Sequence, residues 1–511
     1  MRERAARRRA SSSNALERER APSGSSPAPS ASPQRAWQPP SSSRDTARHA
    51  STTMASDADE RRKKWRCDVA ASSIFAAGQG SPVPFLMAAL PLAGAAATLT
   101  ICIPGELRRV VLRSCAISAA AYGATRHLLP VIGAKVPAAK YGCDLLKRPA
   151  REPIGAADKT VPESLGLVSG VCFVLALVVT QSFQKEQSPE YSAAMLSVVF
   201  AVLLGFADDV LDLEWKYKYV LPPLMSLPLL SAYGGGTTVA PPRVLRELLV
   251  RGADLSAAGA FLDAALSALG GGVDAAGRGL VDLGLAYKVY MVLLAVFCTN
   301  AINIYAGVNG LEAGQTYATG VAILVMSAVE LGRAVGDDGV FDEAENAMAR
   351  HHLFSVTLML PFCATTLALL KSNWFPAEVF VGDTFTNYAG MTLAVVAILG
   401  HFPVMLMALM VPQLLNFLIS VPQLFKLRPC PRHRLPTFDE ATGYLRFSRV
   451  NDRATTVPDE ANIMNLTLIN AALRACRGLT EPALAALLLA LQAATCAAAV
   501  ALRFCLVGRV Y

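Results

Sequence analysis

Long apolar runs, separated by short polar connections, restrict most strongly how this chain can fold. Of its 511 residues, 53% are hydrophobic and 17% are charged, and the mean hydropathy is +0.39. A helix needs about 20 apolar residues to cross the hydrocarbon core of a bilayer. Composition and run length predict an all-α polytopic membrane protein. About ten transmembrane helices are expected near residues 110–132, 165–183, 191–207, 218–234, 285–304, 315–332, 353–371, 387–402, 403–421 and 482–503.

The N-terminal region is expected to lie outside this membrane domain. Residues 1–80 are rich in Ser, Pro and Ala, which is typical of a disordered tail. Residues 1–66 contain 15 of the 47 basic and 7 of the 39 acidic residues, so they account for the whole formal charge of +8. A basic excess confined to such a tail argues against nucleic acid as a partner. The apolar segment in 81–109 is either an extra helix or a signal-like sequence, and the membrane domain is predicted over 110–511.

Helix parity predicts on which side of the membrane each polar segment lies. If the loop after 110–132 faces the cytosol, the loop near 422–481 and all four polar motifs described below face it too. These loops carry more Lys and Arg than the opposite ones, as the positive-inside rule requires. The far side receives an Ala/Gly-rich insert near 235–284, and the pair His351 and His352 is expected to be solvated there.

The segment GFADDVLDL places adjacent aspartates at the end of an apolar helix. A carboxylate at the centre of a bilayer costs about 3 kcal/mol on insertion scales, so Asp208 and Asp209 are expected at a membrane edge or in a polar cavity. At helical spacing Asp208 and Asp212 share one face, and Lys218 follows. Such a cluster can serve a divalent metal ion and a phosphate group.

Two further motifs supply oxygen ligands. FCTNAINIYAGVNGLEAGQ places three amides where a helix leaves the membrane, namely Asn300, Asn303 and Asn309. Gly307 in the same motif lets backbone amides approach an anion. In VFVGDTF, Asp383 is expected in the loop before a helix, where it can reach a metal ion or cap the helix. Phe380 can stack on a flat ring or anchor the chain at the membrane interface.

The motif PCPRHRLP places three cationic or polar side chains between prolines, those of Arg432, His433 and Arg434. Guanidinium groups match phosphate oxygens, and a stiff loop lowers the cost of ordering them. The alternative is an anchor that obeys the positive-inside rule. The loop after 110–132 adds Glu163, which can contact polar parts of a substrate.

In their order and wording, these four motifs resemble the polyprenyl-phosphate N-acetylhexosamine-1-phosphate transferase family, and in particular its eukaryotic, dolichyl-phosphate-using branch. The resemblance runs from about residue 110 to the last helix. It implies Mg²⁺-dependent transfer of GlcNAc-1-phosphate from UDP-GlcNAc to dolichyl phosphate, giving GlcNAc-pyrophosphoryl-dolichol and UMP (EC 2.7.8.15). This is the first step of lipid-linked oligosaccharide synthesis for protein N-glycosylation. It also implies an endoplasmic reticulum membrane location, a cytosolic active site and inhibition by tunicamycin.

The same resemblance implies a role for each motif. Asn303 and Asp383 match the magnesium ligands, and Asp208 and Asp209 match aspartates near the acceptor phosphate. The candidate phosphate contacts are Lys218, Arg432 and Arg434. Asn309 and Phe380 match positions that meet the uracil, and Glu163 and His433 lie in segments expected near the sugar. The other candidate substrate contacts are Asn300, Gly307 and Asp212. Three positions depart from the branch, because Asp212 and Leu146 stand where Asn is usual and Leu165 replaces a polar residue.

Several alternatives remain at this stage. Dolichyl phosphate is expected to attack the β-phosphorus directly, with Asp208 or Asp209 orienting or deprotonating it, and an aspartyl-phosphate intermediate is the alternative. A secondary transporter and a catalytically inactive homologue are the competing functional classes. The lipid bilayer is an expected partner, and a homodimer stays open. The sequon at Asn465 is predicted to remain unglycosylated because parity places it in the cytosol.

Overall fold

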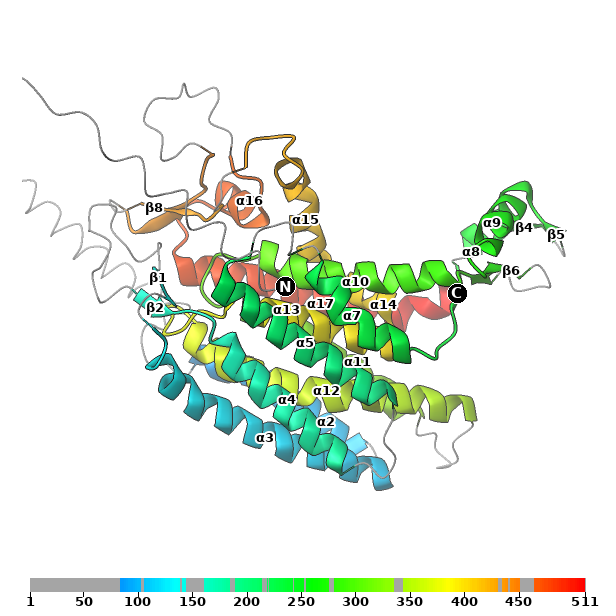
Figure 1. The fold of residues 1–511 in the computed structure, drawn as a ribbon, viewed down its shortest axis with the longest axis horizontal. Helices are drawn as coiled ribbons and strands as arrows, with labels where there is room; N and C mark the ends of the chain where they lie inside the picture. Colours follow the sequence, from blue (N-terminus) through cyan, green and yellow to red (C-terminus); the bar gives the residue numbers. More distant parts are fainter. Residues whose placement is uncertain are drawn as a thin grey trace, which may run out of the picture. The chain divides into compact units, whose positions relative to one another are not determined.

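Helices make up most of the described chain in the computed structural model (Figure 1). The structure describes residues 83–102, 105–137, 140–143, 160–183, 189–213, 218, 220–241, 243–251, 254–274, 280–334, 343–430, 434–439, 442–450 and 464–510. The predicted tail at 1–80 and the candidate site residues Arg432 and His433 lie outside these ranges, as does Leu146. All structural statements below concern the described residues.

A helix lies at each of the predicted apolar runs. These helices are α3 (Gly105–Gly133), α4 (Gly166–Ser182), α5 (Pro189–Leu211), α7 (Leu221–Ala232), α10 (Leu285–Ile304), α11 (Leu311–Ala334), α12 (Glu343–Asn373), α13 (Gly382–Leu399), α14 (Pro403–Leu409), α15 (Val411–Leu424) and α17 (Glu481–Val510). By length and composition, five of the described helices can cross a membrane, or six if the bent pair α14 and α15 counts as one span. The structure therefore supports a multi-pass membrane protein.

The apolar segment before the bundle is also helical. α2 (Val83–Cys102) packs against α3, α11 and α12. The Tyr317 hydroxyl of α11 donates a hydrogen bond of 2.6 Å to the Ala88 carbonyl oxygen of α2. The segment is thus a helix joined to the bundle, and its crossing of the membrane stays a prediction.

Short strands occur outside the bundle, which the all-α prediction missed. In the insert, β3 (Thr238–Val239), β7 (Val281–Asp282) and β6 (Gly272–Val273) form an antiparallel sheet in that order, and β4 (Val250–Arg251) pairs with β5 (Asp254–Leu255). The insert also contains α8 (Arg243–Leu249) and α9 (Ala257–Ser267). Elsewhere β1 (Tyr141–Cys143) pairs with β2 (Thr160–Pro162), β8 (Thr437–Asp439) pairs with β9 (Tyr444–Arg446), and α16 (Leu468–Ala475) follows. Strands of two or three residues are too short to show an alternating pattern in the sequence.

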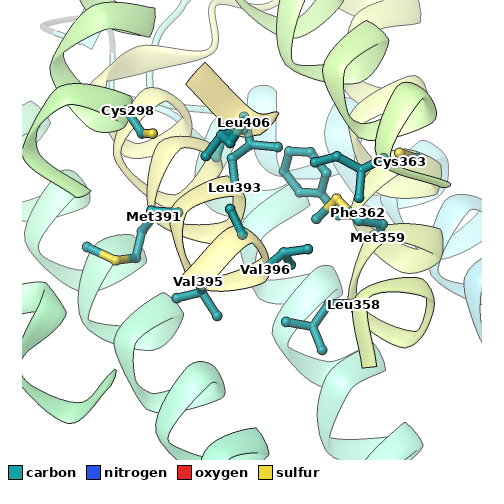
Figure 2. Close-up of a cluster of buried hydrophobic side chains, with 14 of the residues drawn as sticks. Cys298, Leu358, Met359, Phe362, Cys363, Met391, Leu393, Val395, Val396 and Leu406 are labelled. Atoms are coloured by element: carbon teal, nitrogen blue, oxygen red, sulfur yellow. The ribbon is translucent and has the colours of Figure 1, made fainter. Parts of the chain in front are cut away.

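α13 is the central helix of the bundle. Every residue from Met391 to Leu399 is buried, and α13 packs against α5, α10, α12 and α4. Figure 2 shows Leu393 and Val396 of α13 close to Phe362 and Met359 of α12. A helix that is apolar on all sides belongs inside a protein rather than at its surface. The position of α13 matters for function because Asp383 stands in its first turn.

The pair α14 and α15 forms a helix bent by 73° at the buried residue Met410. A broken helix leaves backbone carbonyl groups without partners, which is costly in an apolar interior. The Gln492 side chain of α17 donates a hydrogen bond of 2.9 Å to the Leu409 carbonyl oxygen at the break. The Gln413 side chain of α15 donates to the amide oxygens of Gln315 and Gln492 at 2.8 and 2.9 Å. Three buried glutamines therefore fasten the bend to α11 and α17.

The far-side histidines are not loop residues. Both lie on α12, which begins at Glu343, ten residues before the predicted run. His352 is 1% exposed, and its Nδ1 atom is 3.3 Å from the hydroxyl of Ser327. The expectation that the pair is solvated was wrong for His352, because the polar first turns of α12 hid the true start of the helix.

Candidate functional site

The end of α5 meets the beginning of α13 through the Asp209 carboxylate. The amide nitrogens of Asp383 and Thr384 donate hydrogen bonds to its two oxygens at 2.7 and 3.0 Å, and the Thr384 hydroxyl donates a third at 2.5 Å. The first amides of a helix have no partner within the helix, and its N-terminus carries partial positive charge. Asp209 thus caps α13 from another helix and holds Asp383 in position.

Only glycine fits at position 382, between the Asp209 carboxylate and the backbone of Ser164. Its φ angle is +72°, in the left-handed region that favours glycine. A Cβ atom there would come within 2.5 Å of Asp209 Oδ2 and 2.8 Å of Ser164 Cα. The segment around Ser164 pairs with this turn, because the Leu165 amide donates to the Phe380 carbonyl and the Phe380 amide to the Pro162 carbonyl. The Glu163 loop and the Gly-Asp motif are therefore built together.

Lys218 joins two of the predicted carboxylates. Its ammonium nitrogen lies 2.9 Å from Asp208 Oδ2 and 2.9 Å from Asp383 Oδ2. The other oxygen of Asp383 accepts a hydrogen bond of 2.7 Å from the Asn303 amide. The structure thus brings Asp208, Lys218, Asn303 and Asp383 into one cluster, although they come from three separate motifs.

The charges of this cluster favour a bound cation. Burial lowers the pKa of Lys218, but its interactions with Asp383 and Asp208 outweigh burial and leave that pKa raised. Asp208 is 4% exposed, and among the described residues no hydrogen bond reaches its Oδ1 atom. A buried carboxylate oxygen without a partner is costly unless something else binds it. Mg²⁺ takes oxygen ligands and is typically held by one or two carboxylates plus substrate phosphates, so Asp383, Asn303 and Asp208 fit this ion.

Two glycines allow the helices that carry these groups to approach α13 closely. A Cβ atom at Gly205 of α5 would lie 2.8 Å from Thr384 Cα, and one at Gly390 of α13 would lie 2.5 Å from Thr299 Cα of α10. Gly205 stands one turn before Asp208, and Thr299 one turn before Asn303. Close backbone contact therefore determines how near the carboxylates and the amide lie. Gly205 opens the motif GFADDVLDL, but neither glycine was predicted to have a role.

Lys140 is a site residue that the sequence did not single out. Its ammonium group donates hydrogen bonds of 2.9 Å to the carbonyl oxygens of Asp209 and Val210, at the negative end of the α5 dipole. Its own carbonyl accepts a 3.1 Å hydrogen bond from the Glu163 amide. Desolvation and then the charge of Asp209 raise the pKa of Glu163, and Lys140 opposes this shift. In the sequence Lys140 looks like any basic residue of a cytosolic loop.

Glu163 and Phe380 lie side by side, close to Gly142 of β1. A Cβ atom at Gly142 would touch both the Glu163 carboxylate and the Phe380 ring, whose Cδ2 atom would be 2.9 Å away. The carboxylate and the ring therefore lie together over the β1 backbone, although the resemblance assigns Glu163 to the sugar and Phe380 to the uracil.

The second motif continues into a turn that contacts the fourth. Gly307 has a φ of +118°, and a Cβ atom there would collide with the Leu435 side chain. The backbone amide of buried Asn309 donates a hydrogen bond of 2.9 Å to the Glu481 carboxylate. Arg434, next to Leu435, donates to the Leu466 carbonyl oxygen at 3.3 Å. The structure thus brings Gly307 and Arg434 close together.

Two predicted residues differ from the cluster residues in how they are placed. The Asn300 amide donates at 2.9 Å to the Val296 carbonyl oxygen of its own helix. Asp212 lies beyond the end of α5 with a φ of +47°, and its side chain is exposed. It therefore does not share a helix face with Asp208, and that part of the expectation was wrong. Their proposed contacts with substrate stay predictions.

The chain is similar to known proteins over most of its length. The family model described as glycosyl transferase family 4 matches residues 191–401, from α5 through α13. The chain is 40% identical over 409 residues to UDP-N-acetylglucosamine–dolichyl-phosphate N-acetylglucosaminephosphotransferase of Dictyostelium discoideum, which covers 77% of this chain and 89% of the relative. The chain belongs to glycosyl transferase family 4. A fission yeast member of the family with the same name, from Schizosaccharomyces pombe, is 34% identical over 370 residues, covering 66% of this chain and 73% of its own length.

A more distant member of glycosyl transferase family 4 is bacterial. The phospho-N-acetylmuramoyl-pentapeptide-transferase of Clostridium kluyveri is 23% identical over 277 residues, covering 52% of this chain and 74% of its own length. The large difference in identity places the chain with the dolichyl-phosphate-using members, as the motif wording had indicated. Leu165, one of the departures from their pattern, is 1% exposed, so its apolar side chain packs in the core.

Proposed function

We propose that this family 4 transferase moves GlcNAc-1-phosphate from UDP-GlcNAc to dolichyl phosphate and releases UMP. The observation that carries the proposal is the cluster in which Lys218 links Asp208 to Asp383 while Asn303 binds the other oxygen of Asp383. The relatives of 34–40% identity bear the name of this reaction. The reaction begins lipid-linked oligosaccharide synthesis for N-glycosylation.

The charges explain how such a site would work. Both substrates are anions, so repulsion between them is the main barrier to phosphoryl transfer. A magnesium ion held by Asn303 and Asp383 would withdraw charge from the diphosphate. Lys218 is ready to neutralise a phosphate oxygen, since its ammonium group is already held in place by two carboxylates. Arg434 supplies positive charge beside Gly307, and Arg432 stays a predicted phosphate contact.

The acceptor needs orientation more than activation, because a phosphate monoester is largely ionised at neutral pH. Asp208 can contribute to this orientation through Lys218, since its Oδ2 atom holds the Lys218 ammonium group at 2.9 Å. Asp209 is a positioning residue, since three donors already bind its two oxygens. This makes Asp209 a poor nucleophile and leaves Asp208 as the aspartate to test for a covalent intermediate. If a phosphorylated enzyme can be trapped with the wild type but not with Asp208→Ala, the direct-attack mechanism is overturned.

The location follows from the same proposal. The residues of the cluster stand where α5 and α10 end and where α13 begins, so they share one end of the bundle. We place this end in the cytosol and the protein in the endoplasmic reticulum membrane, with about ten crossings. A transporter is disfavoured, because its site would be expected near the middle of the membrane.

The test is UMP release by the purified full chain. Release should require UDP-GlcNAc, dolichyl phosphate and Mg²⁺ together, and tunicamycin should stop it. Asp383→Asn should lower the rate by about 100-fold or more, as loss of a preorganised charge does in other enzymes. Glu378→Gln, which neutralises a nearby exposed carboxylate, is the matched control and should keep its activity. If the folded wild-type protein releases no UMP, the proposed activity is refuted and the chain is an inactive homologue.

A further inference from the structure

A cavity lies at the other end of the bundle from the carboxylate cluster. Its volume is about 810 Å³, and most of the residues that line it belong to α3, α4, α5 and α12. Glu190, at the start of α5, lines it, whereas Asp208 stands at the end of the same helix. At 1.5 Å per residue these two positions are about 27 Å apart, close to the thickness of a bilayer's hydrocarbon core. The cavity is therefore separate from the proposed active site.

The polar part of this cavity is basic. Arg113 of α3, Arg350 and His351 of α12, and His401 after α13 line it, against the single carboxylate of Glu190. The ring centroids of His351 and His401 are only 4.3 Å apart. Two charged rings at this distance would repel, so the positive charge that favours an anion comes from Arg113 and Arg350, and the two histidines offer ring N–H donors beside it.

The backbone holds His401 in an unusual conformation at this place. Its φ angle is +59°, which costs a residue with a side chain about 1–2 kcal/mol. Gly235 leaves room for the ring, since a Cβ atom there would come within 2.7 Å of His401 Cε1. Tyr233 packs against the same ring with a centroid distance of 6.1 Å. Strain that the surroundings maintain is found most often at functional sites.

Apolar side chains line much of the rest of the cavity. They include Val110 and Ile117 of α3 and Leu353 and Phe354 of α12. Hydrocarbon can lie against these side chains while a charged group reaches the arginines, so the walls suit an amphiphile better than a soluble anion. Basic pockets between membrane helices bind lipid head groups in this way.

We propose that this cavity binds the phosphate head group of an anionic lipid from the leaflet opposite the active site. Arg113 and Arg350 contact the phosphate oxygens, and His351 and His401 lie beside them. The acyl chains run along α3 and α12. The ligand chemistry is a phosphate ester, which a lipid or a soluble phosphate could supply, and the apolar walls favour the lipid.

The test measures binding to the purified full chain by native mass spectrometry and by thermal shift. The probes are phosphatidic acid, phosphatidylcholine and inorganic phosphate. We expect phosphatidic acid to stay bound and to raise the melting temperature, with phosphatidylcholine and inorganic phosphate much weaker. Arg350→Gln should weaken phosphatidic acid roughly tenfold, the loss expected for one charge-assisted hydrogen bond. Arg113→Gln with Arg350→Gln should weaken it further.

The controls separate this site from a general loss of charge or of folding. Arg251→Gln removes the same charge from an exposed arginine of β4 outside the cavity and should bind as the wild type does. Arg350→Lys keeps the charge and should keep most of the affinity, which guards against a double variant that fails to fold. Unchanged binding by Arg350→Gln and the double variant, or equal binding of phosphatidylcholine, would overturn the site. Inorganic phosphate binding as tightly as phosphatidic acid would overturn the lipid as its occupant.

Discussion

Replacing Asp209 by asparagine separates a positioning role from direct contact with substrate. In the structure the carboxylate accepts three hydrogen bonds from Asp383 and Thr384 at the start of α13. Asparagine keeps one acceptor oxygen, and its amide can donate to the Thr384 hydroxyl. One backbone N–H group then loses its partner, and the negative charge at the helix N-terminus disappears.

The size of the effect follows from these two losses. A hydrogen bond to a charged group contributes about 1.5–3 kcal/mol, and a charge at a helix N-terminus about 0.3–1 kcal/mol. Asp209→Asn should therefore weaken the first turn of α13 by about 2–4 kcal/mol. This equals a roughly 30- to 700-fold increase in local opening. Asp209→Ala, which removes all three acceptor contacts, should have a larger effect.

Hydrogen exchange of peptides covering the start of α13 measures this opening directly. The amides of Asp383 and Thr384 should exchange faster in Asp209→Asn, and UMP release should fall with them, because Asp383 loses its fixed position. Glu378→Gln is the control, since it removes an exposed charge without touching α13. If UMP release is lost while these two amides keep full protection, Asp209 acts on the substrate and the positioning argument is refuted.

Three further predictions concern other parts of the chain. Lys140→Met should lower UMP release at least tenfold and speed exchange at the end of α5, since two carbonyl groups lose a charged donor; wild-type exchange there would contradict this. Gly205→Ala should lower stability by about 1–3 kcal/mol in thermal unfolding, because its Cβ atom would press on the α13 backbone. Gly123→Ala is the control and should leave stability unchanged, because a Cβ atom at Gly123 has nothing within 4 Å. Equal melting temperatures of the two variants would refute the contact argument. Peptide mass spectrometry of the expressed chain should find Asn465 unmodified, since its side chain is 1% exposed and bonded to Ser448; a glycan there would reverse the proposed orientation.

The membrane helices and the main members of the cluster could be predicted because their signals are local. Apolar runs of about 20 residues mark helices without any knowledge of their neighbours. Asp208, Lys218, Asn303 and Asp383 stand at the ends of such runs, where charged and polar groups need a reason to be present. The structure places all four in contact, as the shared side of the membrane had suggested.

The different roles of Asp208, Asp209 and Asp212 could not be predicted, because they depend on partners far away in the sequence. The start of α13 was expected near residue 387, where the apolar run begins, yet the helix starts at Gly382. The earlier start is stabilised by Asp209, which is 174 residues from Asp383. Helical spacing likewise suggested that Asp212 joins Asp208, but α5 ends before Asp212 and turns it away.

The angle of the bend between α14 and α15 determines where the far end of α15 lies, and so how far the loop after it extends toward the proposed active site. α15 has 14 residues and is about 21 Å long, so a change of 5° at the bend would shift its far end by about 2 Å. That end leads directly into the loop carrying Arg434. A displacement of about 1 Å can slow an enzyme 100-fold. By fixing the angle of the bend, Gln315, Gln413 and Gln492 therefore keep the far end of α15 in position. Substitutions among these uncharged side chains should therefore affect the handling of phosphate groups that they never touch.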